Sequence, residues 1–140
     1  MAQDTQNFKV SEFACKCCRQ NKINQKVINM AQTIREALGL PVHVNSGYRC
    51  EKHNAEVGGV QKKIDTKTGK KIEGSGSFHM YGLAADLSCA CGAAKLFQTV
   101  KNLKEQGKLP DLDYCIKYKW GVHIDCGGRR KSGHVWEVRA

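Results

Sequence analysis

Apolar residues recur at steps of three and four along residues 23–38, INQKVINMAQTIREAL. The positions that follow this spacing are Ile23, Val27, Met30, Ala31, Ile34 and Leu38. A stripe with the period of the α-helix predicts an amphipathic helix with one face against a core. Gly39 and Pro41 come directly afterwards, and both favour the end of a helix.

A second amphipathic helix is predicted in residues 92–107, GAAKLFQTVKNLKEQG. Its inward positions are Ala94, Leu96, Phe97, Val100 and Leu103, and Gly107 follows them. A short helix is expected in CEKHNAEV, residues 50–57, before the glycines at 58–59.

Four other stretches have the composition of strands. VHVN and LAADLS are short apolar segments, whereas YCIKYKWGVHIDCG and GHVWEVR are rich in aromatic and β-branched residues and predict antiparallel strands. Residues 61–76 are polar and rich in lysine, which indicates a mobile loop or an exposed hairpin around Thr68 and Gly69. Helices and strands that do not alternate strictly predict an α+β domain, a small antiparallel sheet flanked by helices.

The 140 residues suit a single domain spanning 1–140. The chain is 41% hydrophobic and 26% charged, and no apolar run approaches the roughly 20 residues that cross a bilayer, so we expect no membrane span. The formal charge of +10 favours an anionic partner. Because few aromatic residues are interleaved with the lysines, we expect no sequence-specific recognition of nucleic acid.

Eight cysteines would suggest disulfides in a secreted chain. The first residues, MAQDTQNFKVSEF, contain neither a basic leader nor an apolar segment, so we expect synthesis in the cytoplasm without a signal peptide and reduced thiols. FACKCCRQ holds Cys15, Cys17 and Cys18, and SCACG holds Cys89 and Cys91. A structural zinc assembled from both groups is one hypothesis, and buried or reduced thiols are the other.

GSGSFHMYGLAADLS places His79 and Asp86 seven positions apart, with Asp86 inside an apolar strand. A carboxylate there is costly unless it is paired or bound to a cation, and zinc accepts imidazole and carboxylate ligands. A catalytic zinc needs a third ligand from a neighbouring strand. His123 and Asp125 in WGVHIDCGG would share one strand face and could supply a ligand and a general base. His134 is the competing ligand.

Three segments together resemble a known family. VNSGYRCEKHNAEVGGV, SFHMYGLAADLS and WGVHIDCG closely resemble the zinc D-alanyl-D-alanine carboxypeptidases and related murein endopeptidases, whose superfamily includes lysostaphin-type enzymes and the hedgehog signalling domain. The resemblance runs from about Phe8 to about Gly128. The pattern S-x-H-x-x-G-x-A-x-D is matched in full by Ser77, His79, Gly82, Ala84 and Asp86.

This resemblance implies a Zn²⁺ ion held by His79, Asp86 and His123 in a zinc peptidase of hedgehog/D-Ala-D-Ala-peptidase-like fold. It also implies that Arg49 stabilises substrate oxygens and that Ser77 binds substrate, with Tyr48 and Tyr81 lining the cleft. Many members carry an acid three to six residues before the last histidine, but Lys117 to Trp120 contain none. Asp125 is the first candidate for the base and Asp113 the second. The polar segment of residues 61–76, before the motif, is a second departure from the family. It has three alternative interpretations, namely a lid, a wall-binding arm or a surface insertion.

The leading hypothesis is a peptidase that hydrolyses stem or cross-link peptides of bacterial peptidoglycan, and its basic surface suits anionic cell-wall polymers. We expect a monomer that acts on the wall, with release by a phage holin as one route. A non-catalytic binding module of the same fold is the alternative, because the usual acid is missing. A cysteine-ligated zinc module that contacts nucleic acid is the third hypothesis.

Overall fold

The two faces of the central sheet differ in chemistry because side chains alternate along each strand. In the computed structural model, which describes residues 2–128 and 134–139, five strands lie in the order β1-β2-β4-β3-β5. Their bounds are His43–Ser46 for β1, Ala84–Ser88 for β2, Tyr114–Lys117 for β3, Val122–Asp125 for β4 and Trp136–Val138 for β5. One face of β2 and β4 carries Ala85, Leu87, Val122 and Ile124, all fully buried in the hydrophobic core.

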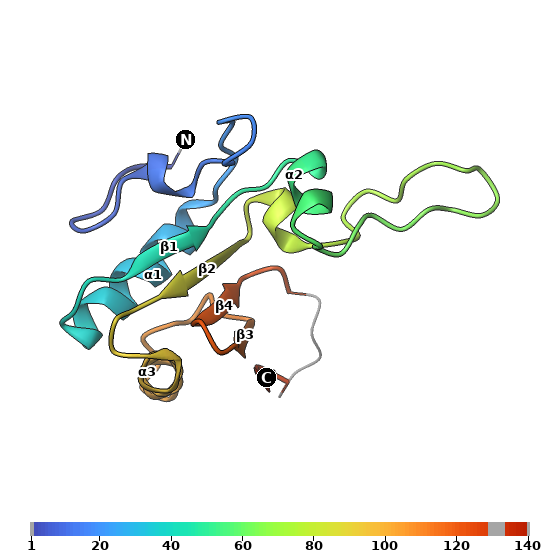
Figure 1. Ribbon diagram of the computed structural model, residues 1–140. Coiled ribbons are helices and arrows are strands. Elements are labelled where there is room, and N and C mark those ends of the chain that lie inside the picture. Colours follow the sequence, from blue (N-terminus) through green and yellow to red (C-terminus); the bar gives the residue numbers. More distant parts are fainter. Residues whose placement is uncertain (1, 129–133, 140) are drawn as a thin grey trace.

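Two long helices form the other half of that core (Figure 1). The first, α1, spans Gln25–Leu38, and α3 spans Ala93–Glu105, which confirms both predicted helices. The Asn24 side chain accepts the Lys26 N–H at the start of α1, and Gly39 ends the helix in the left-handed conformation. The helices contact each other and the strands, so the mixed architecture is the predicted α+β class.

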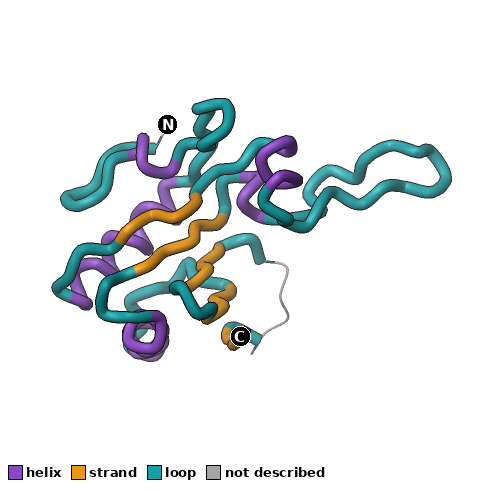
Figure 2. Tube along the Cα trace, in the orientation of Figure 1, coloured by secondary structure: helices purple, strands orange, loops and turns teal. Residues whose placement is uncertain are grey.

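Three short helices stand at the ends of the strands. Two are 3-10 turns, η1 at Val10–Phe13 and η2 at Phe78–Tyr81, and the third is α2 at Glu51–Glu56. Between α2 and η2 the chain makes a long excursion away from the sheet (Figure 2). An isolated bridge between Ile64 and Lys71 spans this excursion, so the polar segment forms an exposed hairpin-like loop.

The last strand corrects one expectation. Residues 133–139 were predicted to pair antiparallel, but β5 lies parallel to β3, with Cys115 opposite Trp136; Gly133 lies outside the described residues. The reason is that β4 already has β2 and β3 on its two edges. A strand that follows β4 and runs back beside β3 must point in the same direction as β3.

The described helices include none with the length and apolar character that a bilayer crossing requires.

Candidate metal centre

The face of the sheet opposite the long helices carries polar side chains from two neighbouring strands. Asp86 of β2 lies directly across from His123 of β4, and Ala84 lies across from Asp125. Because alternate residues share a face, Asp86, His123 and Asp125 all leave the sheet on the side away from Leu87 and Ile124.

His79 approaches this face from η2, just before β2. The Ser77 hydroxyl accepts the His79 N–H at 3.2 Å, and the His79 carbonyl accepts the Arg49 N–H at 2.9 Å. Gly82 then turns the chain into β2 with φ +69°, where a Cβ would lie 1.9 Å from the Lys22 carbonyl oxygen. Only glycine fits this turn, which sets the direction of both His79 and Asp86.

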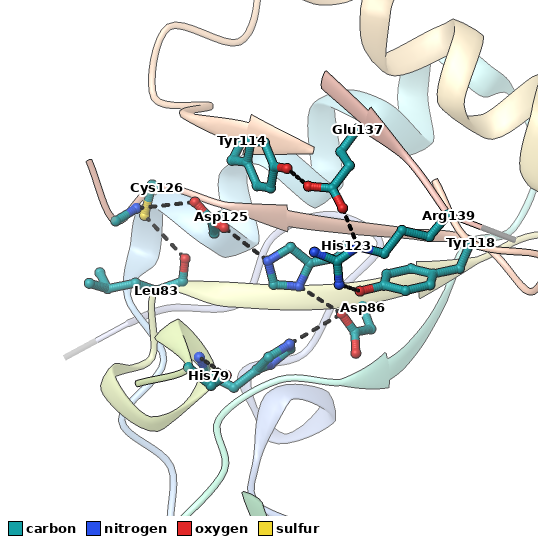
Figure 3. Close-up of polar contacts among 12 residues, drawn as sticks. His79, Leu83, Asp86, Tyr114, Tyr118, His123, Asp125, Cys126, Glu137 and Arg139 are labelled. Atoms are coloured by element: carbon teal, nitrogen blue, oxygen red, sulfur yellow. Dashed lines mark hydrogen bonds and ion pairs between the residues drawn. The ribbon is translucent and has the colours of Figure 1, made fainter. Parts of the chain in front are cut away.

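The three side chains converge on one point (Figure 3). Asp86 Oδ1 lies 3.1 Å from His79 Nε2 and 3.0 Å from His123 Nδ1. One ligand atom from each residue lies within 4.8 Å of the others. His79 is 2% exposed and Asp86 8% exposed, so a charge here is largely removed from water.

The outer nitrogens of both rings have partners of their own. His79 Nδ1 lies 2.7 Å from the Gly47 carbonyl oxygen, which can only accept, so this nitrogen carries the proton. His123 Nε2 lies 2.9 Å from Asp125 Oδ2 on the opposite side of the ring from Asp86. With neutral rings the inner nitrogens are then lone-pair donors that face a carboxylate oxygen.

Three lone-pair donors so close together repel one another unless a proton or a cation lies between them. Two imidazole nitrogens and one carboxylate oxygen, oriented by an outer carbonyl and an outer carboxylate, are a donor set that zinc accepts with a further position left for water. The residues present therefore fit a divalent metal ion.

In the metal-free protein a proton takes that place. Burial lowers the pKa of His123, but hydrogen bonds to Asp125 and Asp86 outweigh it and raise the pKa to about 9. Burial opposes ionisation of Asp86 as well, yet the two imidazoles hold its pKa well below the usual range. Burial lowers the pKa of His79, which favours its neutral form.

Arg49 forms one wall of the site. Its Nη2 donates to Asp86 Oδ2 at 3.0 Å, and its Nε donates to Ser46 Oγ at 2.9 Å. Burial lowers the pKa of Arg49, and the charge of Asp86 opposes that shift. The guanidinium is thus fixed beside the three converging side chains and faces the same cavity.

A cavity of about 590 Å³ opens over these residues. Arg49, Ser77, His79, Asp86, His123 and Asp125, all candidates from the sequence, line it. Sequence reasoning missed other lining residues, among them Tyr114, Tyr118, Trp120 and Arg139. Tyr118 and Trp120 stack with ring centroids 5.0 Å apart, and Arg139 donates to the Tyr118 hydroxyl at 3.1 Å. Their strand-like, aromatic-rich sequence was the available signal.

Four other predicted residues lie outside the cavity lining. Tyr48 is buried with Lys22 over its ring, and the Tyr81 hydroxyl donates to the Ser75 carbonyl and accepts the Gly74 N–H. Asp113 precedes β3 and donates its N–H to the Asp125 carbonyl. His134 is exposed and is not among the three converging ligand residues.

Comparison with known proteins assigns a family. No curated protein matches the sequence. A family model described as Peptidase M15 matches residues 6–125, a span that includes every converging side chain and ends before β5. Because the match covers most of the 140 residues, the chain belongs to the Peptidase M15 family of metal-dependent peptidases.

Proposed function

We propose that the protein is a zinc peptidase that hydrolyses stem or cross-link peptides of bacterial peptidoglycan. The observation that carries this proposal is the convergence of His79 Nε2, His123 Nδ1 and Asp86 Oδ1 in the lining of a cavity of about 590 Å³, beside Arg49. A bound zinc ion would polarise the scissile carbonyl and lower the pKa of a water at the fourth position.

The surrounding residues have separate tasks. Gly47 and Asp125 fix the tautomers of the two histidines through their outer nitrogens. Arg49 offers a planar, permanently charged donor to the carbonyl or carboxylate oxygens of the substrate. Ser77 lines the cavity and accepts the His79 N–H, which leaves its hydroxyl hydrogen for a substrate acceptor.

The assignment of the general base stays a prediction, with Asp125 first and Asp113 second. Asp125 is 4% exposed, and its Oδ2 accepts from His123. This position supports an orienting role for Asp125 directly. Asp113 lies outside the described cavity lining, so a base role for it requires movement.

One observation favours the alternative of a non-catalytic binding module of the same fold. Among the described residues that line the cavity, the acids are Asp86 and Asp125, and both are already engaged with the histidines. A module of this kind would hold the metal and bind wall peptides or a protein without hydrolysis.

The remaining proposals concern partners and place of action. The +10 charge suits the anionic polymers of the wall, and we propose a monomer that reaches the wall after synthesis in the cytoplasm. Release by a phage holin is one route.

The test uses purified sacculi and zinc-loaded protein, with the released fragments identified by mass spectrometry. A peptidase releases fragments with new amino and carboxyl termini, and their masses identify the bond. The His79→Ala/His123→Ala variant should release none while it keeps the circular dichroism of the unmodified protein. Sacculi that bind the zinc-loaded protein but yield no new termini would establish the binding module instead.

A further inference from the structure

A second cluster of potential metal ligands lies away from the cavity. The Sγ atoms of Cys15, Cys18 and Cys50 all lie within 4.8 Å of one another, although Cys50 is 35 residues from Cys15 in the sequence. Cys15 follows η1, and Cys50 is the residue that caps the start of α2. The cluster therefore joins the N-terminal segment to the segment that follows β1.

One sulfur–sulfur distance in the cluster matches that of a tetrahedral zinc site. Cys15 Sγ and Cys50 Sγ lie 3.7 Å apart. With Zn–S bonds of about 2.3 Å, tetrahedral geometry separates two sulfurs by about 3.8 Å. A disulfide would bring them to about 2.05 Å, and all eight cysteines are free.

Backbone amides point at these sulfurs. Cys50 donates its N–H to Cys15 Sγ at 3.5 Å, and His53 donates its N–H to Cys50 Sγ at 3.4 Å. Burial raises the pKa of the Cys15 thiol, but hydrogen bonds from the amides of Cys50, Cys18 and Cys17 outweigh it and lower the pKa to about 7. Amides that donate to sulfur stabilise the thiolate, which is the form that binds metal.

We propose that Cys15, Cys18 and Cys50 bind a structural zinc ion through their thiolates, and that Cys17 supplies the fourth. Cys15 and Cys18 have the C-x-x-C spacing common among structural zinc ligands, with Cys17 between them. Burial and the neighbouring Cys50 thiol raise the pKa of Cys17, so Cys17 lies near Cys50 and would lose its proton on binding the metal. Four thiolates would make a closed site with no position for substrate.

This site differs from the one that the sequence suggested. One of the two hypotheses from the sequence was that Cys89 and Cys91 share a zinc with the first group, but they follow β2 and interact with each other, the Cys91 N–H donating to Cys89 Sγ at 3.3 Å. Neither belongs to a described group of three converging ligands. The partner of the first group is Cys50, which sequence reasoning left unassigned.

The proposed ion would brace the segment that positions the peptidase residues. Tyr48 donates its N–H to the Phe13 carbonyl at 2.8 Å, and a Cβ on Gly47 would lie 2.5 Å from that same oxygen. Gly47 in turn orients His79, and Arg49 directly precedes Cys50. A metal ion that joins Cys15 to Cys50 would therefore hold residues 47–49 against the N-terminal segment that contains Phe13.

The experiment isolates this site by removing the other. The His79→Ala/His123→Ala protein, expressed with zinc, should retain one zinc per chain by elemental analysis. With Co²⁺ in place of zinc it should show sulfur-to-cobalt charge-transfer absorption. Adding Cys15→Ser and Cys18→Ser should abolish both signals, whereas the matched control Cys89→Ser/Cys91→Ser should leave them unchanged.

The fourth ligand is tested separately. In the same His79→Ala/His123→Ala protein, Cys17→Ser should weaken zinc binding, and unchanged zinc affinity would remove Cys17 from the site.

A measurement without cysteine substitutions covers the case in which those variants fail to fold. Titration of the His79→Ala/His123→Ala protein with an organomercurial should release one zinc per chain to a metal-sensitive dye. No bound zinc and no charge-transfer band would overturn the proposal. An intact mass lower by two hydrogens would instead identify a disulfide and would also overturn it. Because the catalytic histidines are absent throughout, neither outcome depends on the proposed peptidase activity.

Discussion

Asp86 and His123 face each other directly across the β2–β4 pair, and Asp86 Oδ1 lies 3.0 Å from His123 Nδ1. Directly opposed residues of an antiparallel pair have Cβ atoms only about 5 Å apart, so the strand register alone brings this carboxylate and imidazole together. A slip of one residue would send one of them into the hydrophobic core. The packing of Leu87 and Ile124 therefore also secures the metal centre.

Replacing Asp86 with asparagine should remove the metal from this centre. The amide keeps the shape of the side chain but loses the charge that faces two imidazole nitrogens. We expect zinc affinity, measured by competition with a chelator, to fall by more than the roughly 10–100-fold cost of losing an outer hydrogen-bond partner. Asp113→Asn is the matched control, because Asp113 lies outside the described cavity lining. Equal affinities of the two variants would contradict the ligand assignment.

Asp125→Asn and Asp125→Ala should distinguish orientation of His123 from general-base catalysis. If Asp125 orients His123, zinc affinity should fall roughly 10–100-fold in the alanine variant. Asparagine, whose amide oxygen can still accept from Nε2, should restore much of it. If Asp125 is the base, both variants should keep zinc yet lose kcat, along with the acidic limb of the pH–rate profile. Zinc titration and pH–rate profiles of both variants separate the two roles.

Zinc affinity of the peptidase centre should rise with pH. The pKa of His123 is raised from 6.5 to about 9 in the metal-free protein, so below pH 9 zinc must displace a proton from this ring. Affinity should increase about tenfold per pH unit up to about pH 9 and then level off. The same raised pKa stabilises the metal-free fold below about pH 6.5, and this contribution is lost as the pH rises through 9. Affinity that is independent of pH between 6.5 and 9 would contradict a protonated His123.

Arg49→Lys should impair turnover while the metal stays bound. The guanidinium holds Ser46, Asn54 and Asp86 at once, and an ammonium on a flexible stem cannot reproduce that planar arrangement. We expect kcat/KM on peptidoglycan fragments to fall roughly 100- to 1,000-fold, as when a fixed oxyanion donor is removed. Arg35→Lys on α1 serves as the control. A variant with full activity would exclude Arg49 from substrate binding.

The sequence was sufficient for the elements whose signals are local. The apolar steps from Val27 to Ile34 predicted a helix, which α1 confirms. The spacing of His79 and Asp86 around Gly82 led to two of the three converging side chains. His134 competed with His123 for the third position, and the resemblance to the family favoured His123. The helix and the turn around Gly82 depend on periodicity and on turn chemistry, which act within one segment of the chain.

Features that depend on distant segments were not predictable in this way. The parallel direction of β5 follows from the occupied edges of β4, which no single segment encodes. Cys50 meets Cys15 only because Phe13 and Tyr48 pair their backbones, and the cavity wall of Tyr118 and Arg139 exists only once β5 lies beside β3. The hydrogen bond between His123 and Asp125 was likewise not predictable. The strand pattern places both side chains on one face of the sheet, but it does not determine the rotation of the His123 ring.

Gly82→Ala should destabilise the fold much more than Gly107→Ala, which makes the pair a test of the turn before β2. Both glycines have positive φ, +69° and +74°, so an alanine at either position carries a backbone cost of about 1–2 kcal/mol. At Gly107 nothing lies within 4 Å of the new Cβ, whereas at Gly82 the Lys22 carbonyl oxygen would be 1.9 Å away. Displacing that backbone should add about 1–3 kcal/mol to the loss of unfolding free energy, measured by urea titration. It should also weaken zinc binding, because Gly82 directs both His79 and Asp86. Equal destabilisation by the two substitutions would show that the Lys22 backbone moves aside at little cost in free energy. It would also show that the turn does not fix the geometry of the metal centre.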